Sequence, residues 1–369
     1  MAKTDIPRRC WAEIDLGALV HNAGVAREAG GGSDVMAVIK ADAYGHGMVG
    51  VGAALESSVD CFGVASVEEG MRLRSAGCKK PVMLLGAVVP DFFPALVEHD
   101  LQAMLSSIEE ARALSEAAVA AGKIVAVHLM LDTGMGRIGF LNERSLGRLA
   151  GLDNLDIVGV ASHYPSADVD EAYTREQLGR FLERVEAAEL APRWVHIANS
   201  AGVLGFPSDA TNLVRAGLML YGSSPLTEHQ EKLHPALAWK SRISLVRDLP
   251  PGSSVSYGRT FATDRVPFTR VATVSVGYGD GYQRALSGKG AEVLIRGQRC
   301  PLLGRVTMDQ IMVDVTGLGD VVGAGDEVVL IGEQGAESIL AVEVAHKAGT
   351  IAWEVFTSIS QRVSRVYVH

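Results

Sequence analysis

The first two-thirds of the chain alternates short apolar runs with longer stretches rich in Ala, Glu and Leu. Each run is about five to nine residues long and continuously apolar, which is typical of parallel strands buried on both faces. The runs are Val35–Ile39, Cys61–Ala65, Pro81–Leu85, Leu101–Leu105, Val125–Leu131, Ile157–Ala161, Trp194–Ala198 and Leu213–Tyr221. Eight such runs with helical intervals between them predict a (β/α)8 barrel. An open doubly wound sheet fits less well, because it usually has about five or six strands and a glycine fingerprint, which this sequence lacks.

Helices are expected in the intervals between the strands. The candidate helices are Val67–Ala76, Glu109–Ala121, Glu143–Ala150 and Glu171–Leu190. In the last of these, apolar side chains recur at roughly helical spacing, so that one face can pack against the strands. We therefore expect the barrel to extend over residues 16–235.

The character of the sequence changes after residue 235, where short β-type runs are broken by Gly and Pro. These runs are Trp239–Val246, Arg270–Val276, Glu292–Arg296, Ile311–Val315 and Asp326–Ile331. They predict a C-terminal, mostly antiparallel β domain over residues 236–369. Residues 1–15 include a weakly alternating segment, Arg9–Asp15, which we expect to add a strand to that domain.

The composition excludes several classes of protein. Of the 369 residues, 48% are apolar and 21% are charged, which argues against disorder and against a coiled-coil rod. A net charge of −9 without a basic block argues against nucleic-acid binding. The sequence shows neither an apolar run of the ~18–20 residues that span a membrane nor the apolar stretch of a signal peptide. We therefore expect a soluble, cytoplasmic protein without membrane contact.

Cysteines and histidines give no sign of a metal site. The four cysteines, Cys10, Cys61, Cys78 and Cys300, are scattered and lack CxxC spacing, which indicates reduced, mostly buried thiols. The histidines do not pair with one another or with a nearby carboxylate at metal-ligand spacing. We expect no bound metal.

Chemically active side chains follow several of the predicted strands. In a barrel of this type the active site lies at the C-terminal ends of the strands. Lys40 follows the first strand, and Arg137, His163 and Ser200 follow the fifth, sixth and seventh, while Arg215 lies in the eighth. The second, third and fourth strands end without such residues, so the chemistry is concentrated on one side of the barrel mouth.

The combination of Lys40 with a phosphate site indicates pyridoxal phosphate. A lysine that closes an apolar strand either extends its amine to solvent or forms a covalent bond with a carbonyl cofactor. The loops after the last two strands are the usual phosphate site of a barrel. There Ser200 offers a hydroxyl, and we expect Gly202 and Gly217 to permit close approach of the backbone. A lysine and a phosphate cradle on one rim favour this cofactor over others.

Arg215 and His163 each have a structural and a catalytic interpretation. Arg215 lies in an apolar strand, where it either forms a structural ion pair or, beside pyridoxal phosphate, hydrogen-bonds the pyridine nitrogen and leaves it unprotonated. His163 is either a satisfied histidine at the rim or, because of its place at a strand end, part of the site.

Motifs along the whole chain resemble the alanine racemase family, and they occur in the family's order. Val38–Gly47, with the sequence VIKADAYGHG, is similar to the family's cofactor-attachment motif. The other segments are Ala12–Leu16, Asp132–Arg137, His196–Ser200, Val214–Gly217, Val255–Gly258, Gly277–Tyr282 and Gly304–Gln310. The resemblance therefore covers both expected domains.

The resemblance implies a homodimer in which each active site takes residues from both chains. Lys40 would carry pyridoxal phosphate and act as the base on the D face of the substrate, while Tyr257 of the partner subunit would act on the L face. Two bases are needed because a planar carbanion must lose a proton on one side and regain one on the other. Since a phenol is a weak base at neutral pH, His163 would bond the tyrosine and Arg215 would support the histidine.

The resemblance also assigns binding roles. Arg137 and the backbone N–H of Met308 of the partner subunit would hold the substrate carboxylate, and Tyr278 would narrow the entrance. The residues that would hold the cofactor are Lys40, Tyr44, Ser200, Arg215, Gly217 and Leu218.

Two positions depart from the family pattern. Many members have a lysine, carbamylated in use, where Met130 stands, so Arg137 must be held by a chloride ion or by a neighbouring side chain. Many relatives have a tyrosine where Gln361 stands. The amide is smaller and more flexible, and we therefore expect measurable racemisation of serine, with alanine still preferred.

The function implied is alanine racemisation, which supplies D-alanine for cell-wall peptidoglycan. A serine or broad-specificity racemase is the nearest alternative. A decarboxylase with the same cofactor is disfavoured by Tyr257, because loss of carbon dioxide needs no second base. A non-catalytic carrier of the cofactor would usually end after the barrel, whereas residues 236–369 follow it here.

Overall fold

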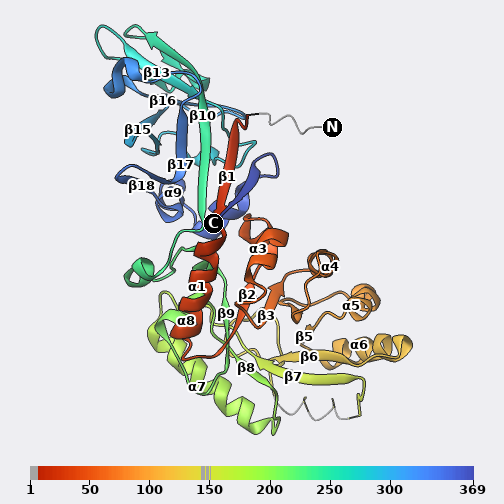
Figure 1. Ribbon diagram of the computed structural model, residues 1–369. Coiled ribbons are helices and arrows are strands. Elements are labelled where there is room, and N and C mark those ends of the chain that lie inside the picture. The colour runs from red at the N-terminus through yellow and green to blue at the C-terminus, as the bar shows by residue number, and fades with distance from the viewer. Residues whose placement is uncertain (1–6, 143–145, 147–148, 150) are drawn as a thin grey trace. The chain divides into compact units, whose positions relative to one another are not determined.

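The computed structural model describes residues 7–142, 146, 149 and 151–369. Within this part the chain forms two compact units (Figure 1). The barrel unit comprises described residues of segments 17–43 and 47–234, and the β unit comprises those up to residue 16, 44–46 and 235–369. The short segment Tyr44–His46 thus belongs to the β unit, although the residues on both sides of it belong to the barrel unit.

Parallel strands form the centre of the barrel unit. Within the described ranges they are β2 (Asp34–Val38), β3 (Cys61–Val64), β4 (Val82–Leu84), β5 (Ala103–Leu105), β6 (Val125–Met130), β7 (Leu155–Ala161), β8 (Trp194–His196) and β9 (Leu213–Ala216). They pair in the orders β4-β3-β2-β9 and β5-β6-β7-β8. Leu84 N–H donates to the Gln102 carbonyl at 2.9 Å, and Asn212 N–H donates to the Val195 carbonyl at 3.1 Å. These bonds join the two groups into a ring, which confirms the predicted barrel.

Helices connect these strands, and those that follow β3, β4 and β5 lie outside the ring (Figure 1). The helices are α1 (Leu16–Ala29), α3 (Met48–Leu55), α4 (Val67–Ser75), α5 (Phe93–Glu98), α6 (Ile108–Ala121), α7 (Glu171–Ala187) and α8 (Ser200–Gly205). The helix predicted over Glu143–Ala150 lies mostly outside the described residues. No helix in the described part combines the length and the hydropathy needed to cross a membrane.

Serine caps start two of the helices and place a glutamate near the barrel mouth. Ser66 accepts a hydrogen bond from Glu69 N–H at 3.3 Å, and Ser107 accepts one from Glu110 N–H at 3.1 Å. Both serines precede a glutamate at the third helical position, as in a capping box, but each glutamate accepts the N–H of the residue before the serine. The Glu69 carboxylate accepts the N–H of Ala65 at 2.8 Å. Glu69 is therefore fixed at the C-terminal end of β3, on the side where the site residues lie.

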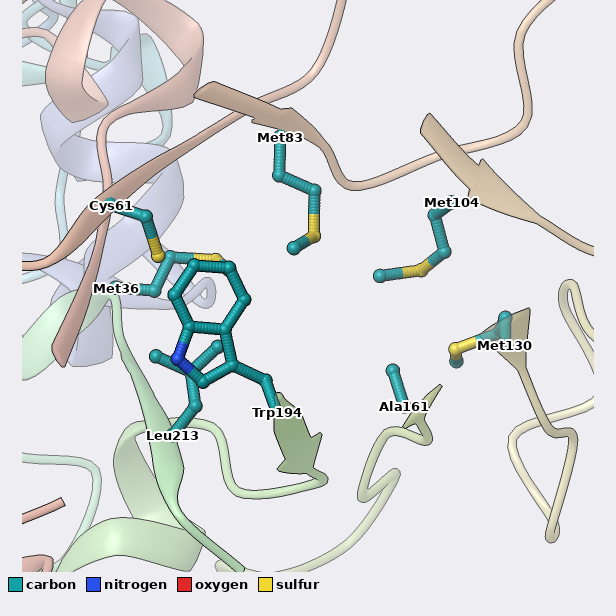
Figure 2. Close-up of a cluster of buried hydrophobic side chains, with 8 residues drawn as sticks. All are labelled: Met36, Cys61, Met83, Met104, Met130, Ala161, Trp194 and Leu213. Atoms are coloured by element: carbon teal, nitrogen blue, oxygen red, sulfur yellow. The ribbon is translucent and has the colours of Figure 1, made fainter. Parts of the chain in front are cut away.

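The barrel interior is rich in sulfur (Figure 2). One apolar cluster takes a residue from each strand: Met36, Cys61, Met83, Met104, Met130, Ala161, Trp194 and Leu213. Thioether side chains are flexible and fill irregular space, so they pack this interior without a fixed geometry. Met130 is only 2% exposed and is part of this packing.

The β unit is built on one large sheet of mostly antiparallel strands, as predicted. The sheet order is β18-β17-β14-β15-β16-β13-β10-β1-β19, and β17 also pairs with β10, which closes the central strands into a ring. The strands are β1 (Cys10–Asp15), β10 (Leu237–Leu249), β13 (Thr269–Val274), β14 (Glu292–Ile295), β15 (Gln298–Leu303), β16 (Ile311–Asp314), β17 (Glu327–Gln334), β18 (Glu337–Ile339) and β19 (Ser364–Val368). A short hairpin of β11 (Ser254–Val255) and β12 (Phe261–Ala262) and two helices, α9 (Ala341–Ala348) and α10 (Ala352–Ser358), complete the unit.

Three sequence interpretations were wrong or incomplete. The last barrel strand ends at Ala216, because the backbone turns at Gly217 and continues as a 3-10 helix, Leu218–Tyr221. Strand β15 was not predicted, since Pro301 and its polar neighbours hide the pattern. A Cβ at Gly202 would lie 2.7 Å from the Tyr164 ring, so this glycine is required for packing against the tyrosine, whereas the expectation was a close approach of the backbone to a phosphate.

Candidate active site

Lys40 is followed by an unusual left-handed turn. Ala41, Asp42, Ala43 and Tyr44 all have φ between 49° and 56°. Each non-glycine residue in this conformation costs roughly 1–2 kcal/mol. Contacts with the surroundings hold the turn: Ala41 N–H donates to Glu69 Oε1 at 2.7 Å, and Asp42 Oδ1 accepts Met48 N–H at 3.1 Å. Such concentrated strain is typical of functional sites, where it fixes the direction of a side chain.

The Lys40 amine is half-buried beside other cations. Burial lowers its pKa, the positive charges of Arg137 and Arg215 lower it further, and Glu69 partly opposes them. A lowered pKa increases the fraction of neutral amine, which is the form that attacks a carbonyl group. The position thus favours covalent chemistry at Lys40.

Arg215 is a buried cation bound only by neutral groups. Its Nη2 lies 3.0 Å from His163 Nδ1 and donates to the carbonyls of Ser162 and Ile197 at 2.8 and 2.9 Å. Its Nη1 lies 2.7 Å from His196 Nδ1. Burial lowers its pKa to about 10, so it remains charged at neutral pH. Among the described residues no carboxylate pairs with it, and the structural ion pair considered from the sequence does not form.

His163 is held neutral in a defined tautomer. Burial, together with the charges of Arg215, Arg137 and Lys40, lowers its pKa to about 3. Because a guanidinium only donates, the Nδ1 atom that faces Arg215 must accept, and the proton of the ring lies on Nε2. His163 can therefore donate one hydrogen bond from Nε2.

A group of donors converges near the start of α8. The Ser200 hydroxyl oxygen accepts the N–H groups of Gly217 and Met219 at 3.0 and 3.3 Å. Leu218 lies between these two residues, at the first position of the 3-10 helix that follows β9. The N–H groups of Gly217 and Met219 are thus occupied by Ser200, while the Ser200 O–H and the Leu218 N–H, for which no described residue is the acceptor, remain to bind a phosphate group.

Arg137 lies in a loop shaped by Asp132. The Asp132 carboxylate accepts the N–H groups of Gly134, Met135 and Gly136 at 2.9–3.1 Å. Arg137 itself is exposed, and no hydrogen bond or ion pair of its guanidinium occurs within the described part of the chain. It raises the positive potential around Lys40 and Arg215. An unpaired guanidinium near other cations is suited to bind a carboxylate.

The β unit presents three of the predicted residues on turns. Tyr257 is 71% exposed and begins a short 3-10 turn after Ser256, whose φ is 65°. Tyr278 N–H donates to the Thr307 carbonyl at 3.0 Å, which brings Tyr278 beside Met308. Within the described residues, nothing accepts the Met308 N–H. This N–H is therefore available to a ligand.

Tyr44 and Gln361 are brought near one another by Arg365. Tyr44 is buried, which raises its pKa to about 12, and its hydroxyl accepts a hydrogen bond from the Trp353 side chain. Arg365 donates to the carbonyls of Gly45 and Ser360 at 2.8 and 2.6 Å. Arg365 therefore links Gly45, which follows Tyr44, to Ser360, which precedes Gln361. Gln361 is exposed in that turn.

The structure gathers Lys40, Arg137, His163, Ser200, Arg215, Gly217 and Leu218 in the barrel unit and Tyr44, Tyr257, Tyr278 and Met308 in the β unit. Sequence reasoning missed the supporting residues Glu69, Gln102, His128, His196 and Arg365. Only His196 carried a signal, because it opens one of the motifs. No group of three or more His, Cys, Asp or Glu side chains in the described ranges could hold a metal ion.

Two family models match the chain in succession. The alanine racemase N-terminal domain matches residues 14–225, and the alanine racemase C-terminal domain matches residues 236–367. An alanine racemase of Symbiobacterium thermophilum is 45% identical over 372 residues, which cover 98% of this chain and 97% of that protein. An alanine racemase of Halothermothrix orenii is 42% identical over 373 residues, with the same shares covered.

Solved structures agree over both units. The crystal structure of alanine racemase from Streptomyces lavendulae has a TM-score of 0.91 at 36% identity, and covers 99% of this chain and 98% of that one. That of the Bacillus anthracis enzyme with bound L-Ala-P has a TM-score of 0.90 at 35% identity, covering 99% and 96%. These likenesses confirm the resemblance of the sequence motifs, and the chain belongs to the alanine racemase family.

Proposed function

We propose that this chain interconverts L- and D-alanine with pyridoxal phosphate as its cofactor. The observation that carries the proposal is the lysine with lowered pKa beside Arg137 and Arg215, in a chain whose curated relatives are alanine racemases over nearly their whole length. D-alanine made in this way would supply cell-wall peptidoglycan.

The barrel residues fit the cofactor. Lys40 would hold its carbonyl carbon, while Ser200, Gly217 and Leu218 would hold its phosphate, together with Tyr44. The Gly217 N–H would exchange its bond to Ser200 for one to the phosphate. When bound, pyridoxal phosphate supplies an electron sink for the Cα–H bond of the amino acid. Arg215 is buried, charged and without a carboxylate partner in the described residues, which suits a permanent donor to the ring nitrogen.

Two residues would move the Cα proton. Lys40 would act on the D face, and Tyr257 of the partner subunit on the L face. The high exposure of Tyr257 within its own chain supports a role at a neighbouring subunit. The proton on His163 Nε2 would donate to the phenolate and favour its charged form. Arg137 and the N–H of Met308 of the partner subunit would fix the substrate carboxylate, with Tyr278 at the entrance.

Isotope exchange tests the proposal directly. The cofactor-loaded protein is incubated with L-alanine in deuterium oxide, and proton NMR and chiral chromatography follow the α-proton and the D-isomer. We expect both loss of the α-proton signal and formation of D-alanine. Tyr257→Phe should retain exchange of D-alanine at Lys40 but lose conversion to L-alanine, with Tyr278→Phe as the control phenol. Neither exchange nor inversion in the native protein would reject alanine as substrate.

The homodimer is tested by dilution. If each site needs Tyr257 and Met308 from a second chain, specific activity falls once the protein is diluted below its dimer dissociation constant. Constant specific activity in a preparation shown to be monomeric would contradict the shared site.

Serine is the second substrate to test. Gln361 is exposed and replaces a larger aromatic side chain of many relatives, so a hydroxymethyl group should be accepted. We expect slower but measurable serine racemisation, and Gln361→Tyr should lower the rate with serine relative to alanine. Equal or faster turnover of serine by the native protein would replace alanine as the preferred substrate.

A further inference from the structure

The hydrogen bonds behind Arg215 continue as a chain through the barrel interior. Arg215 Nη1 lies 2.7 Å from His196 Nδ1, and His196 Nε2 lies 2.9 Å from His128 Nδ1. His128 Nε2 in turn lies 3.2 Å from Gln102 Oε1. Both histidines are completely buried. The chain thus crosses from β9 through β8 and β6 to the residue before β5.

Only one arrangement of protons satisfies every contact. The guanidinium can only donate, so His196 Nδ1 accepts and the His196 proton lies on Nε2. His196 Nε2–H then donates to His128 Nδ1. The His128 proton therefore lies on Nε2 and faces the amide oxygen of Gln102. Burial lowers the pKa of both rings, that of His128 to about 3, so both are neutral at neutral pH.

The fold provides space for His128 and restricts its ring. A Cβ at position 159 would overlap the His128 ring, so Gly159 is the residue that leaves room for it. The Trp194 ring stacks on the imidazole, with 5.6 Å between centroids and 16° between planes. The His196 ring meets it at 77°. A ring enclosed in this way cannot turn over to exchange its two nitrogens without displacing its neighbours.

We propose that His196, His128 and Gln102 are positioning residues that hold the orientation of Arg215 through one continuous chain of hydrogen bonds, whose proton arrangement Arg215 itself sets. Each residue of the chain directs its acceptor atom toward Arg215, so the hydrogen bonds are aligned. Aligned hydrogen bonds strengthen one another. The charge of Arg215 is thereby stabilised without a carboxylate that could compete for its N–H groups. What this means for catalysis rests on the proposed function, in which Arg215 must remain a donor to the cofactor ring.

The tautomers can be measured without any activity. Protein labelled with ¹⁵N-histidine in the native dimer gives separate long-range NMR signals for protonated and unprotonated ring nitrogens. We expect His196 and His128 each to show a protonated Nε2 and an unprotonated Nδ1 at neutral pH. A protonated Nδ1 on either ring, or a mixture of forms, would overturn the proposal.

Gln102→Met removes the acceptor at the end of the chain while keeping the length of the side chain. We expect the tautomers to persist, because Arg215 and His196 still direct them, while the absorbance spectrum of the bound cofactor changes and kcat falls about tenfold, roughly the effect of one lost hydrogen bond. The KM for alanine should change little, because the substrate-binding residues remain in place. Gln102→Glu keeps an acceptor oxygen at the same reach and should keep the native spectrum and most of the rate.

Cys61→Ala is the matched control, because Cys61 belongs to the same apolar cluster but lies on β3, which carries no residue of the chain. It should lower stability but leave the tautomers, the spectrum and kcat unchanged. If Gln102→Met behaves like this control, the proposal is refuted. If Gln102→Met does not fold, the native tautomers and Gln102→Glu still decide. If the native protein has no racemase activity, the NMR result tests the chain independently of the proposed function.

Discussion

Mild acid is expected to destabilise the barrel through its buried histidines. His128 and His163 have pKa values lowered to about 3, and that of His196 is also far below its usual value. Between these values and the ordinary histidine pKa of about 6.5, the unfolded chain binds protons that the folded chain does not. The stabilisation is therefore complete above about pH 6.5 and is lost as the pH falls toward the folded pKa values.

The magnitude follows from the protonation of the unfolded state. From about pH 7 to about pH 5, a histidine with an ordinary pKa goes from about one-quarter to almost fully protonated, which stabilises the unfolded chain by about 2 kcal/mol. Because the folded pKa of each ring lies well below 5, the folded state binds almost no protons at these rings in this pH range. The three rings together therefore contribute about 6 kcal/mol to the loss of stability. This is comparable with the total stability of many proteins, about 5–15 kcal/mol.

Urea unfolding at the two pH values measures this loss, with subunit concentration held constant. His128→Gln should reduce the pH-dependent loss by about one-third, because one of three buried rings is removed. Met104→Ala deletes a buried side chain without a titrating group and should lower stability equally at both pH values. If His128→Gln keeps the full pH dependence of the native protein, the buried neutral histidines are not its cause.

Three further predictions concern Gly159, Arg365 and Arg137, and a fourth variant, Gly179→Ala, is the control for the first. Gly159→Ala should lower the unfolding free energy by about 3 kcal/mol or more in urea titrations, because its Cβ overlaps the His128 ring. The exposed Gly179→Ala in α7, with nothing within 4 Å of its Cβ, should instead stabilise by up to about 1 kcal/mol. Arg365→Lys cannot replace a guanidinium that donates to four carbonyls, and cofactor absorbance after gel filtration should show weaker retention. Arg137→Ala should raise the KM for alanine with little change in Tm, since its guanidinium forms no bond within the described residues; a Tm loss like that of Gly159→Ala would contradict this.

The barrel could be predicted because its signal is local. Each strand is a continuous apolar run, and the structure places the strands within a few residues of the runs. The polar residues at the strand ends could be found for the same reason, since chain order alone puts Lys40, His163 and Ser200 at one rim.

The supporting contacts could not be predicted, because they join residues far apart in sequence. Gln102, His128 and Arg215 come from three different strands or their flanks, and only the closed ring makes them neighbours. The role of Arg365 depends on Tyr44–His46 belonging to the β unit, and nothing in the local sequence marks this. A charged residue in an apolar strand indicated a partner for Arg215, but not that neutral histidines would replace a carboxylate.

The left-handed turn after Lys40 provides a test of stored strain. Ala41 is exposed with φ 53°, where alanine is unfavourable by roughly 1–2 kcal/mol and glycine is not. Glycine also makes the unfolded chain more flexible, at a cost of about 0.5–1 kcal/mol, so Ala41→Gly should leave stability unchanged or raise it by up to about 1 kcal/mol. Ala41→Val should lower stability, because a β-branched residue is poorly tolerated at positive φ.

The same pair of variants separates stability from positioning. If strain in the turn directs Lys40, Ala41→Gly should bind the cofactor less tightly although it is at least as stable, because the lysine then samples more directions. Thermal unfolding and cofactor titration on the same preparations measure the two effects. A glycine variant destabilised by more than about 1 kcal/mol, or a valine variant as stable as the native protein, would show that the turn is not strained. The bond from Ala41 N–H to Glu69 would then be sufficient to explain why the turn forms.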